Sequence, residues 1–259
     1  MHNLLGRLVL AGALAFMGDA NAKAGETKSK IVLVHGAFTE SSSWAGVIER
    51  LSRDGYEVIA AANPLRGVAD DAAAISTILN ALPAPVVLVG HSYGGPVITE
   101  AANKAANVKA LVYVAAFAPD VGESSLTLSS RFPGSTLGDA LMAVPRADGS
   151  HDLYIDTAKF HEQFAADVSP EQARVMAATQ RPVADVALAE PSGTASWKTI
   201  PSYAIYGSKD RNIPPAVMEF MAERARSEKT VVLEGASHAL MISHPDEVAS
   251  LIEDAASAP

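Results

Sequence analysis

Three residues of this chain have the types and the order that serine-based nucleophilic catalysis requires. Ser92 is the centre of a G-x-S-x-G motif at residues 90–94, which follows an apolar run and precedes a helix-like stretch. Flanking glycines let a sharp strand-to-helix turn close, and such a turn holds the serine oxygen at the end of a sheet. Because serine attacks well only when an imidazole removes its proton, the downstream Asp210 and His238 predict a Ser-His-Asp triad. An ordinary glycine-serine turn is the alternative for this motif.

The histidine of this arrangement has to be chosen from seven in the chain. His238 lies in a loop after the last predicted core strand, which is where the third member of the triad is expected. An unperturbed pKa of about 6.5 lets histidine accept a proton and later return it near neutral pH. His244, directly before Pro245 at a predicted helix start, is kept as the alternative, with a structural role as its more ordinary interpretation.

The carboxylate has two candidates. Asp210 follows a predicted strand at residues 202–206, in a turn where it can accept the second imidazole proton and stabilise the imidazolium. Asp120 follows an earlier strand and can equally be a turn residue. We favour Asp210 because its position agrees with the order of the motif.

An oxyanion formed at Ser92 needs preorganised hydrogen-bond donors. We expect one from the backbone N–H of Tyr93 and the other from Ala37, in the loop after the first core strand. Each such donor typically lowers a barrier by about 3 kcal/mol.

The histidines and acidic residues show no metal-ligand spacing such as H-x-H or H-E-x-x-H, so we expect no metal and no cofactor.

The elements that must position these residues alternate along the chain. Predicted strands lie at residues 30–34, 56–60, 85–89, 108–115, 202–206 and 230–233, and helices at residues 44–53, 70–82, 96–106, 214–226 and 245–255. Alternation of this kind favours an α/β fold, with a mostly parallel sheet and right-handed crossovers. Residues 23–119 and 198–259 are therefore predicted to form the core.

Residues 120–197 interrupt the alternation. They contain several prolines and glycines, helix-like pieces at residues 157–166 and 170–178, and no clear parallel strand, so we predict an inserted, mainly helical cap. Its large apolar residues either line a pocket beneath the cap or form the core of the cap itself. The set that we consider is Phe117, Phe132, Met142, Tyr154, Phe160, Phe164, Met176 and Trp197.

The first 22 residues have the pattern of a secretory signal peptide. Arg7 precedes a short apolar run at residues 8–16, and an A-x-A site follows at residues 20–22. The run is shorter than the roughly 20 residues that span a bilayer, and the absence of cysteine excludes a lipoprotein anchor. We expect a processed chain, periplasmic or secreted, with no membrane anchor; an uncleaved membrane-proximal helix is the alternative.

The net charge of −9 provides no basic surface for nucleic acid.

With these motifs in place, the chain resembles the α/β-hydrolase superfamily over residues 31–252. The sequences V-L-V-H-G-A-F at residues 32–38, G-H-S-Y-G-G at residues 90–95 and Y-G-S-K-D at residues 206–210 most resemble plant methyl esterases, hydroxynitrile lyases and their bacterial relatives. This resemblance implies a six-stranded core sheet with a cap over the nucleophile, and the triad named above.

Departures from the resemblance narrow the expected reaction. The lyases carry threonine and lysine where this chain has Gly36 and Ala239, so cyanohydrin cleavage is disfavoured and ester hydrolysis is favoured. Ser92 argues against epoxide hydrolases and haloalkane dehalogenases, whose nucleophile is an aspartate. We therefore expect a carboxylic ester hydrolase, with an acyl-enzyme intermediate, for small or medium, partly apolar esters.

The same triad also serves lactonases, C–C bond hydrolases and cofactor-free perhydrolases, and these alternatives stay open. A slow-turnover ligand-binding protein on the hydrolase scaffold is the alternative from another class, since function resides in the site and not in the fold. The expected partner is a small-molecule ester, and a homodimer is left open.

Overall fold

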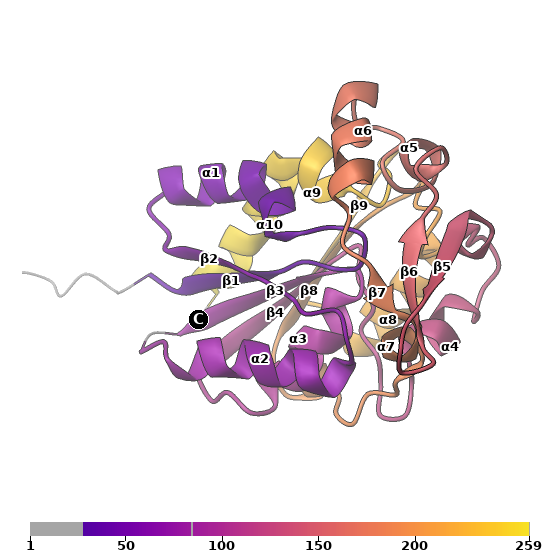
Figure 1. Cartoon of the computed structure of the whole chain (residues 1–259). Helices are drawn as coiled ribbons and strands as arrows, with labels where there is room; N and C mark the ends of the chain where they lie inside the picture. The colour runs from indigo at the N-terminus through magenta and orange to yellow at the C-terminus, as the bar shows by residue number, and fades with distance from the viewer. Residues whose placement is uncertain (1–27, 84, 259) are drawn as a thin grey trace, which may run out of the picture.

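The computed structural model describes residues 28–83 and 85–258. A central sheet of six parallel strands runs through the molecule in the order β2-β1-β3-β4-β8-β9 (Figure 1). The strands are β1 Lys30–Val34, β2 Val58–Ala61, β3 Val86–His91, β4 Val108–Val114, β8 Ser202–Gly207 and β9 Lys229–Leu233. The predicted α/β fold and the six-stranded sheet implied by the resemblance are confirmed.

The sequence of the central strands reflects their complete burial. All six residues of β3 are buried, and the apolar residues of β1 are buried on both faces. Continuous apolar runs are typical of parallel strands that helices cover on both sides. Strand β2 begins two residues later than predicted, because the Tyr56 N–H donates to the Leu51 carbonyl and so closes the end of the preceding helix.

Helices cover both faces of the sheet. Helix α1 (Ala45–Arg53) packs beside α10 (Pro245–Ser257) on one face, and α2 (Val68–Asn80) packs beside α3 (Gly94–Ala102) on the other (Figure 1). Helix α8 (Pro215–Ala225) packs on β8. The carboxyl ends of the parallel strands therefore stay uncovered by these helices and can carry a site.

The segment between β4 and β8 lies at that end of the sheet and contributes no strand to it (Figure 1). Its helices are α4 Ser125–Ser129, α5 Phe160–Phe164, α6 Pro170–Thr179 and α7 Asp185–Ala189. A second, antiparallel sheet joins β5 (Leu141–Pro145), β6 (His151–Ile155) and β7 (Val183–Ala184). We call this segment the cap; the limits at residues 120 and 197 stay a prediction.

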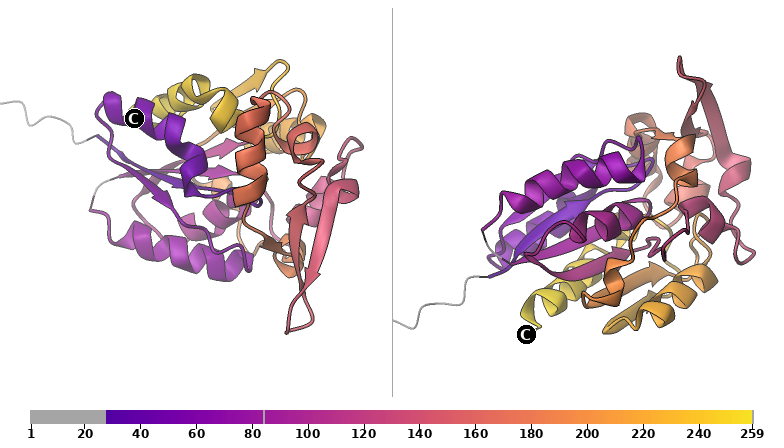
Figure 2. Two further views of the ribbon diagram at one scale, coloured as in Figure 1. Left: turned by 45° about the horizontal axis from the view of Figure 1, so that its top comes forward. Right: turned by 90° about the horizontal axis from the view of Figure 1, so that it is seen from below.

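The antiparallel strands of the cap were not predicted, although a signal for them exists. Asp148 and Gly149 lie between two short β-prone runs, and an Asp-Gly pair in that setting is typical of a hairpin. Gly149 has φ +87°, and the Arg146 N–H donates to the Ser150 carbonyl at 2.8 Å. Figure 2 shows the β5–β6 hairpin extending away from the body of the molecule.

Hydrogen bonds to charged groups attach the cap to the core. The Glu190 carboxylate accepts from the N–H groups of Val68 and Ala69 at the start of α2, at 2.6 and 3.1 Å. A carboxylate at a helix N-terminus also opposes the positive end of the helix dipole. Arg66 of the core forms an ion pair with Asp152 of β6. These contacts hold the cap in a defined position over the sheet.

The predicted signal peptide, residues 1–22, lies outside the described residues and stays a prediction. Within residues 28–83 and 85–258, no helix is both long enough and apolar enough to cross a membrane.

Candidate active site

Ser92 lies in the turn between β3 and α3, as its motif requires. Its φ of +53° is in the left-handed region, which is unfavourable for a residue with a side chain and is typical of functional turns. The Ser92 N–H donates to the Val114 carbonyl at 3.2 Å, and its carbonyl accepts from the N–H of Gly95 at 2.9 Å. The turn is compact, because a Cβ on Gly95 would lie 2.0 Å from the Phe117 carbonyl oxygen.

His238 and Asp210 form a buried pair. Nδ1 of His238 lies 2.6 Å from Oδ2 of Asp210, and both side chains are at most 1% exposed. Oδ1 of Asp210 accepts from the backbone N–H groups of Asn212 and Ile213, at 2.8 and 3.0 Å. Both carboxylate oxygens are therefore occupied as acceptors, and the proton of a neutral His238 lies on Nδ1. Nε2 is left unprotonated, and it is buried without a hydrogen-bond partner in the part of the chain that the structure describes.

The His238 ring is packed against aromatic neighbours. Phe164 approaches it edge-on with ring centroids 4.9 Å apart, and the His91 ring lies at 4.8 Å. Nε2 of His91 donates to the backbone carbonyl of His238 at 3.1 Å. Burial holds the pKa of His91 well below its usual value, so this ring is neutral. His91 directly precedes Ser92, and it therefore links the turn that carries the serine to the loop that carries His238.

Ala37 and Tyr93 lie beside Ser92 and line one cavity with it. Neither of the two backbone N–H groups is engaged by another described residue, whereas the next N–H in the first loop, that of Phe38, donates to the Arg181 carbonyl. A Cβ on Gly36 would lie 2.6 Å from the Cβ of Ser92, so only glycine lets this loop approach the serine so closely. Ala37 and Tyr93 therefore lie close to Ser92, and their role as donors to an oxyanion stays a prediction.

A buried histidine holds this loop in place. Nδ1 of His35 donates to the Gly36 carbonyl at 2.9 Å, and Nε2 accepts from the Asn63 N–H at 3.0 Å. Burial lowers the pKa of His35 to about 4, so the ring is neutral and can act as donor and acceptor together.

The cavity at Ser92 has a volume of about 230 Å³, and its walls are mostly apolar. Core and cap both contribute, through Phe117 and Ile213 from the core and Leu126, Leu137, Leu141 and Leu188 from the cap. Of the eight large apolar residues singled out from the sequence, Phe117 lines this cavity and Met176 lines a second one.

The other six of that set lie elsewhere. Phe160 and Phe164 of α5 are fully buried, Phe132 packs against Phe220, and Met142 is 45% exposed. The indole N–H of Trp197 donates to the Pro119 carbonyl. Pocket lining was therefore the wrong interpretation for most of the set, and the aliphatic residues that do line the cavity carry no motif that marks them.

The two alternative triad residues have other partners. Asp120 forms an ion pair with Lys198, and this hydrogen bond lowers the pKa of its carboxyl group. Nε2 of His244 lies 3.4 Å from Oδ2 of Asp167, near the start of α10. Within the described part of the chain, no hydrogen bond or ion pair joins either residue to Asp210 or His238. Among the described residues, no group of three or more His, Cys, Asp or Glu side chains could hold a metal ion.

Comparison with known proteins identifies the family and the fold. A model of the alpha/beta hydrolase family matches residues 31–251. Alpha/beta hydrolase nvfD of Aspergillus novofumigatus is 29% identical over 88% of this chain and 97% of its own. A putative chloroplastic methylesterase of Arabidopsis thaliana is 26% identical over 85% of this chain and 62% of its own length. The crystal structure of polyneuridine aldehyde esterase superposes with a TM-score of 0.76 at 19% identity, over 88% of this chain and 99% of that one.

Proposed function

Because the chain belongs to the alpha/beta hydrolase family, we propose that it is a carboxylic ester hydrolase that uses Ser92, His238 and Asp210 through an acyl-enzyme. The resemblance to methylesterases predicted from the sequence motifs is confirmed by the relatives that match the chain. The observation that carries the proposal is the buried Asp210–His238 pair, with Nε2 of the histidine unprotonated and unpartnered.

In the first half of the reaction, the Ser92 hydroxyl oxygen attacks the ester carbonyl carbon while Nε2 of His238 takes the hydroxyl proton. The negative charge that develops on the carbonyl oxygen is stabilised by the N–H groups of Ala37 and Tyr93. Asp210 stabilises the imidazolium that forms. His238 then protonates the departing alcohol as the carbon–oxygen bond breaks, and the acyl group stays on Ser92.

In the second half, water replaces the alcohol. His238 removes one proton as the water oxygen attacks the acyl carbon, and the same two N–H groups hold the second oxyanion. Collapse of this intermediate returns the proton to Ser92 and releases the carboxylic acid. The pair is set for this exchange because a neutral His238 already carries its proton on the nitrogen facing Asp210.

The proposed substrate is a small or medium, partly apolar ester. The mostly apolar walls and the volume of about 230 Å³ favour a short or medium acyl group over a polymer chain. The methylesterase relative acts, by its name, on methyl esters, and this supports a small-molecule ester as the partner.

The decisive experiment compares the mature chain with Ser92→Ala, using a fluorophosphonate probe and p-nitrophenyl esters from acetate to octanoate. We expect probe labelling and ester turnover to disappear together in Ser92→Ala. Ser130→Ala is the matched control, because this exposed serine donates only to the Leu126 carbonyl and does not line the cavity. Labelling without ester turnover would favour the lactonase or C–C bond hydrolase alternative, which lactone and β-diketone substrates test. An unlabelled wild-type chain would favour the ligand-binding alternative.

We also propose that the protein is exported, on the strength of the signal-like residues 1–22. N-terminal sequencing of the mature chain from periplasm and medium tests this, and a start near Lys23 is the expected result. A homodimer stays open, and light scattering of the same sample measures the oligomeric state.

A further inference from the structure

Two buried polar atoms in the wall of the cavity at Ser92 have no hydrogen-bond partner among the described residues. They are Nδ2 of Asn212, in the loop after β8, and Oγ of Ser125, in helix α4 of the cap. Each of these two residues is only 3% exposed. A buried polar group without a partner costs free energy, and a mostly apolar cavity usually orients its ligand through a few such groups. The function proposed above gives neither atom a role.

The orientation of the Asn212 amide is determined by Gln163 of α5. The Arg211 backbone carbonyl can only accept, so the Gln163 group 3.0 Å from it is the NH₂ group, Nε2. The same Nε2 lies 2.7 Å from the Asn212 amide, and because two donors would repel each other, the Asn212 atom on that side is Oδ1. Gln163 does not line the cavity at Ser92, so the oxygen side of the Asn212 amide faces away from this cavity and the NH₂ group lies on the other side.

The remaining polar groups of Asn212 have partners in the protein. Its N–H donates to Oδ1 of Asp210 at 2.8 Å, and its carbonyl oxygen accepts from the Ser135 hydroxyl at 2.9 Å. The backbone of Asn212 is therefore fixed to the triad carboxylate on one side and to the cap on the other. Within the described chain, only Nδ2 is left, as a firmly held donor in a cavity that Ser92 also lines.

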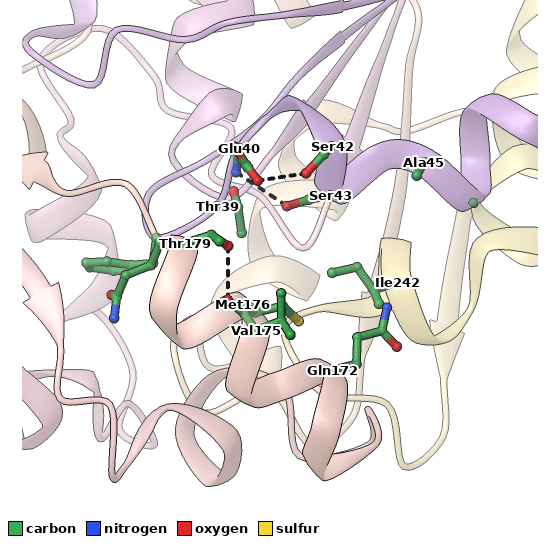
Figure 3. A pocket seen from close by; sticks show the side chains of 13 residues that line it. Thr39, Glu40, Ser42, Ser43, Ala45, Gln172, Val175, Met176, Thr179 and Ile242 are labelled. Carbon is green, nitrogen blue, oxygen red and sulfur yellow. Dashed lines mark hydrogen bonds between the residues drawn. The ribbon is translucent and has the colours of Figure 1, made fainter.

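The second cavity, between the cap and the core, differs in this respect. It has a volume of about 270 Å³, and its walls come from α6 and from residues 38–46. Figure 3 shows two of its hydroxyl groups engaged within the protein, since Ser42 donates to the Glu40 carboxylate and Thr179 donates to the Val175 carbonyl. Among the described residues, none that lines this cavity has a buried polar atom without a partner. Unpaired buried atoms thus distinguish the first cavity from the second.

We propose that Nδ2 of Asn212 and Oγ of Ser125 bind a second oxygen atom of the ester, one that takes no part in the reaction. The substrate class is thus a small ester that also carries an uncharged acceptor oxygen, such as that of a ketone or an ether. This assignment rests on the ester hydrolase function proposed above. It makes Asn212 and Ser125 specificity-determining residues, one from the core and one from the cap.

The chemistry of the cavity limits the kind of oxygen. Nδ2 of Asn212 can only donate, so its partner must be an acceptor. The Ser125 hydroxyl can donate as well, and a ketone oxygen can accept from two donors. Within the described residues, no Lys, Arg, His, Asp or Glu side chain lines this cavity, so a carboxylate on the substrate would be buried without an opposite charge. A neutral oxygen avoids this cost.

The test compares kcat/KM for esters that are matched in size and differ in this oxygen. Methyl levulinate carries a ketone oxygen where methyl isocaproate carries a methyl group, and methoxyethyl acetate carries an ether oxygen where butyl acetate carries a CH₂ group. In wild type we expect the oxygen-bearing ester to be preferred in at least one pair. Asn212→Asp should lower that preference about tenfold, because it replaces the donor with an acceptor and keeps the oxygen that Gln163 binds. Asn212→Ala also removes the donor, and it serves if Asn212→Asp does not fold.

Two matched controls separate this contact from general destabilisation. The Asn107 NH₂ group donates to two backbone carbonyls at 2.9 Å, and Asn107 does not line the cavity, so Asn107→Asp should leave the ester ratios at their wild-type values. Ser125→Ala should lower the same ratio as Asn212→Asp does. Its control is Ser129→Ala, because Ser129 lies on the same helix and lines the same cavity but is partly exposed to water. That variant should leave the ratio unchanged.

Binding is measured apart from turnover by calorimetry with Ser92→Ala. This variant should bind the preferred ester of the pair more tightly than its oxygen-free match, and the double variant with Asn212→Asp should bind the two alike. The assignment is overturned if wild type has no preference in either pair, or if both Asn212 variants leave the preference unchanged. It is also overturned if wild type prefers monomethyl succinate, which carries a carboxylate in place of the methyl ketone, to methyl levulinate.

Failure of the ester hydrolase function gives a different result. A wild-type chain without Ser92-dependent turnover of any of these esters would refute that function, while unequal binding by Ser92→Ala that depends on Asn212 would still support the polar contact.

Discussion

Replacing Asp210 with asparagine should inactivate the enzyme by trapping His238 in the wrong tautomer. Oδ1 of Asp210 accepts from the N–H groups of Asn212 and Ile213, so the carbonyl oxygen of an asparagine must take that position. Its NH₂ group then faces Nδ1 of His238 at the 2.6 Å contact. Nδ1 has to become an acceptor, and the imidazole proton moves to Nε2, where it prevents the ring from taking the proton of Ser92.

The expected loss is about 10⁴-fold in kcat, because this substitution removes the general base and the charge that stabilises the imidazolium. At about 1.4 kcal/mol for each tenfold change, the barrier rises by about 5.5 kcal/mol. The backbone contacts of Oδ1 are kept, so we expect only a small change in the urea midpoint of unfolding.

The assay is stopped-flow turnover of p-nitrophenyl acetate, which separates the burst of acylation from steady-state hydrolysis. Asp120→Asn is the control, because Asp120 pairs with Lys198 and not with the histidine, and it should keep a kcat close to that of wild type. The reasoning is refuted if Asp210→Asn keeps more than about 1% of wild-type kcat, or if Asp120→Asn loses as much activity as Asp210→Asn.

Three further predictions concern stability. The pKa of His35 is 6.5 in the unfolded chain and about 4 in the folded protein, so between these pH values the unfolded state binds more protons. Lowering the pH from 6.5 to 4 should therefore reduce the free energy of unfolding by about 3 kcal/mol. Urea titrations at several pH values should show a weaker pH dependence for His35→Gln than for wild type. Gly95→Ala places a Cβ 2.0 Å from a backbone oxygen, so it should destabilise the folded protein by about 3 kcal/mol or prevent folding. Gly138→Ala is the control, because a Cβ at Gly138 meets open space, and its unfolding temperature by calorimetry should match that of wild type. Tyr93→Phe removes the donor 2.9 Å from the buried Asp71 carboxylate and should cost about 1–3 kcal/mol; an unchanged urea midpoint would contradict this.

The parts of the fold that could be predicted from sequence are those with local signals. Strands β1 and β3 are continuous apolar runs, and burial between two layers of helices requires that composition. The strand-to-helix turn at Ser92 could be predicted because such a turn needs glycines at fixed positions. The pairing of Asp210 with His238 could be predicted because both residues follow strands of the parallel sheet, whose carboxyl ends meet at one edge.

The walls of the two cavities could not be predicted in the same way. Phe38, Gln172 and Ile242 are far apart in sequence, and they share a wall only because the cap packs on the core. Leu126 and Leu188 are ordinary aliphatic residues with no periodic pattern that marks a cavity. Size and apolar character left pocket lining and packing as equal alternatives for the large residues of the cap, because both environments favour the same side chains.

The placement of the cap between β4 and β8 affects how this protein can change over evolutionary time. These two strands are hydrogen-bonded neighbours, paired from Leu111 with Ser202 to Val114 with Ile205, so the sheet would close in the same order around a longer, shorter or unrelated insert. The entropy of closing a loop rises slowly, by about 0.6 kcal/mol for each doubling of its length. Mutation can therefore remodel the surfaces that choose the substrate, while the turn carrying Ser92 and the loops carrying Asp210 and His238 are inherited unchanged. Chimeras that exchange whole caps between relatives at these two strand ends would transfer preference for a substrate without rebuilding the chemistry.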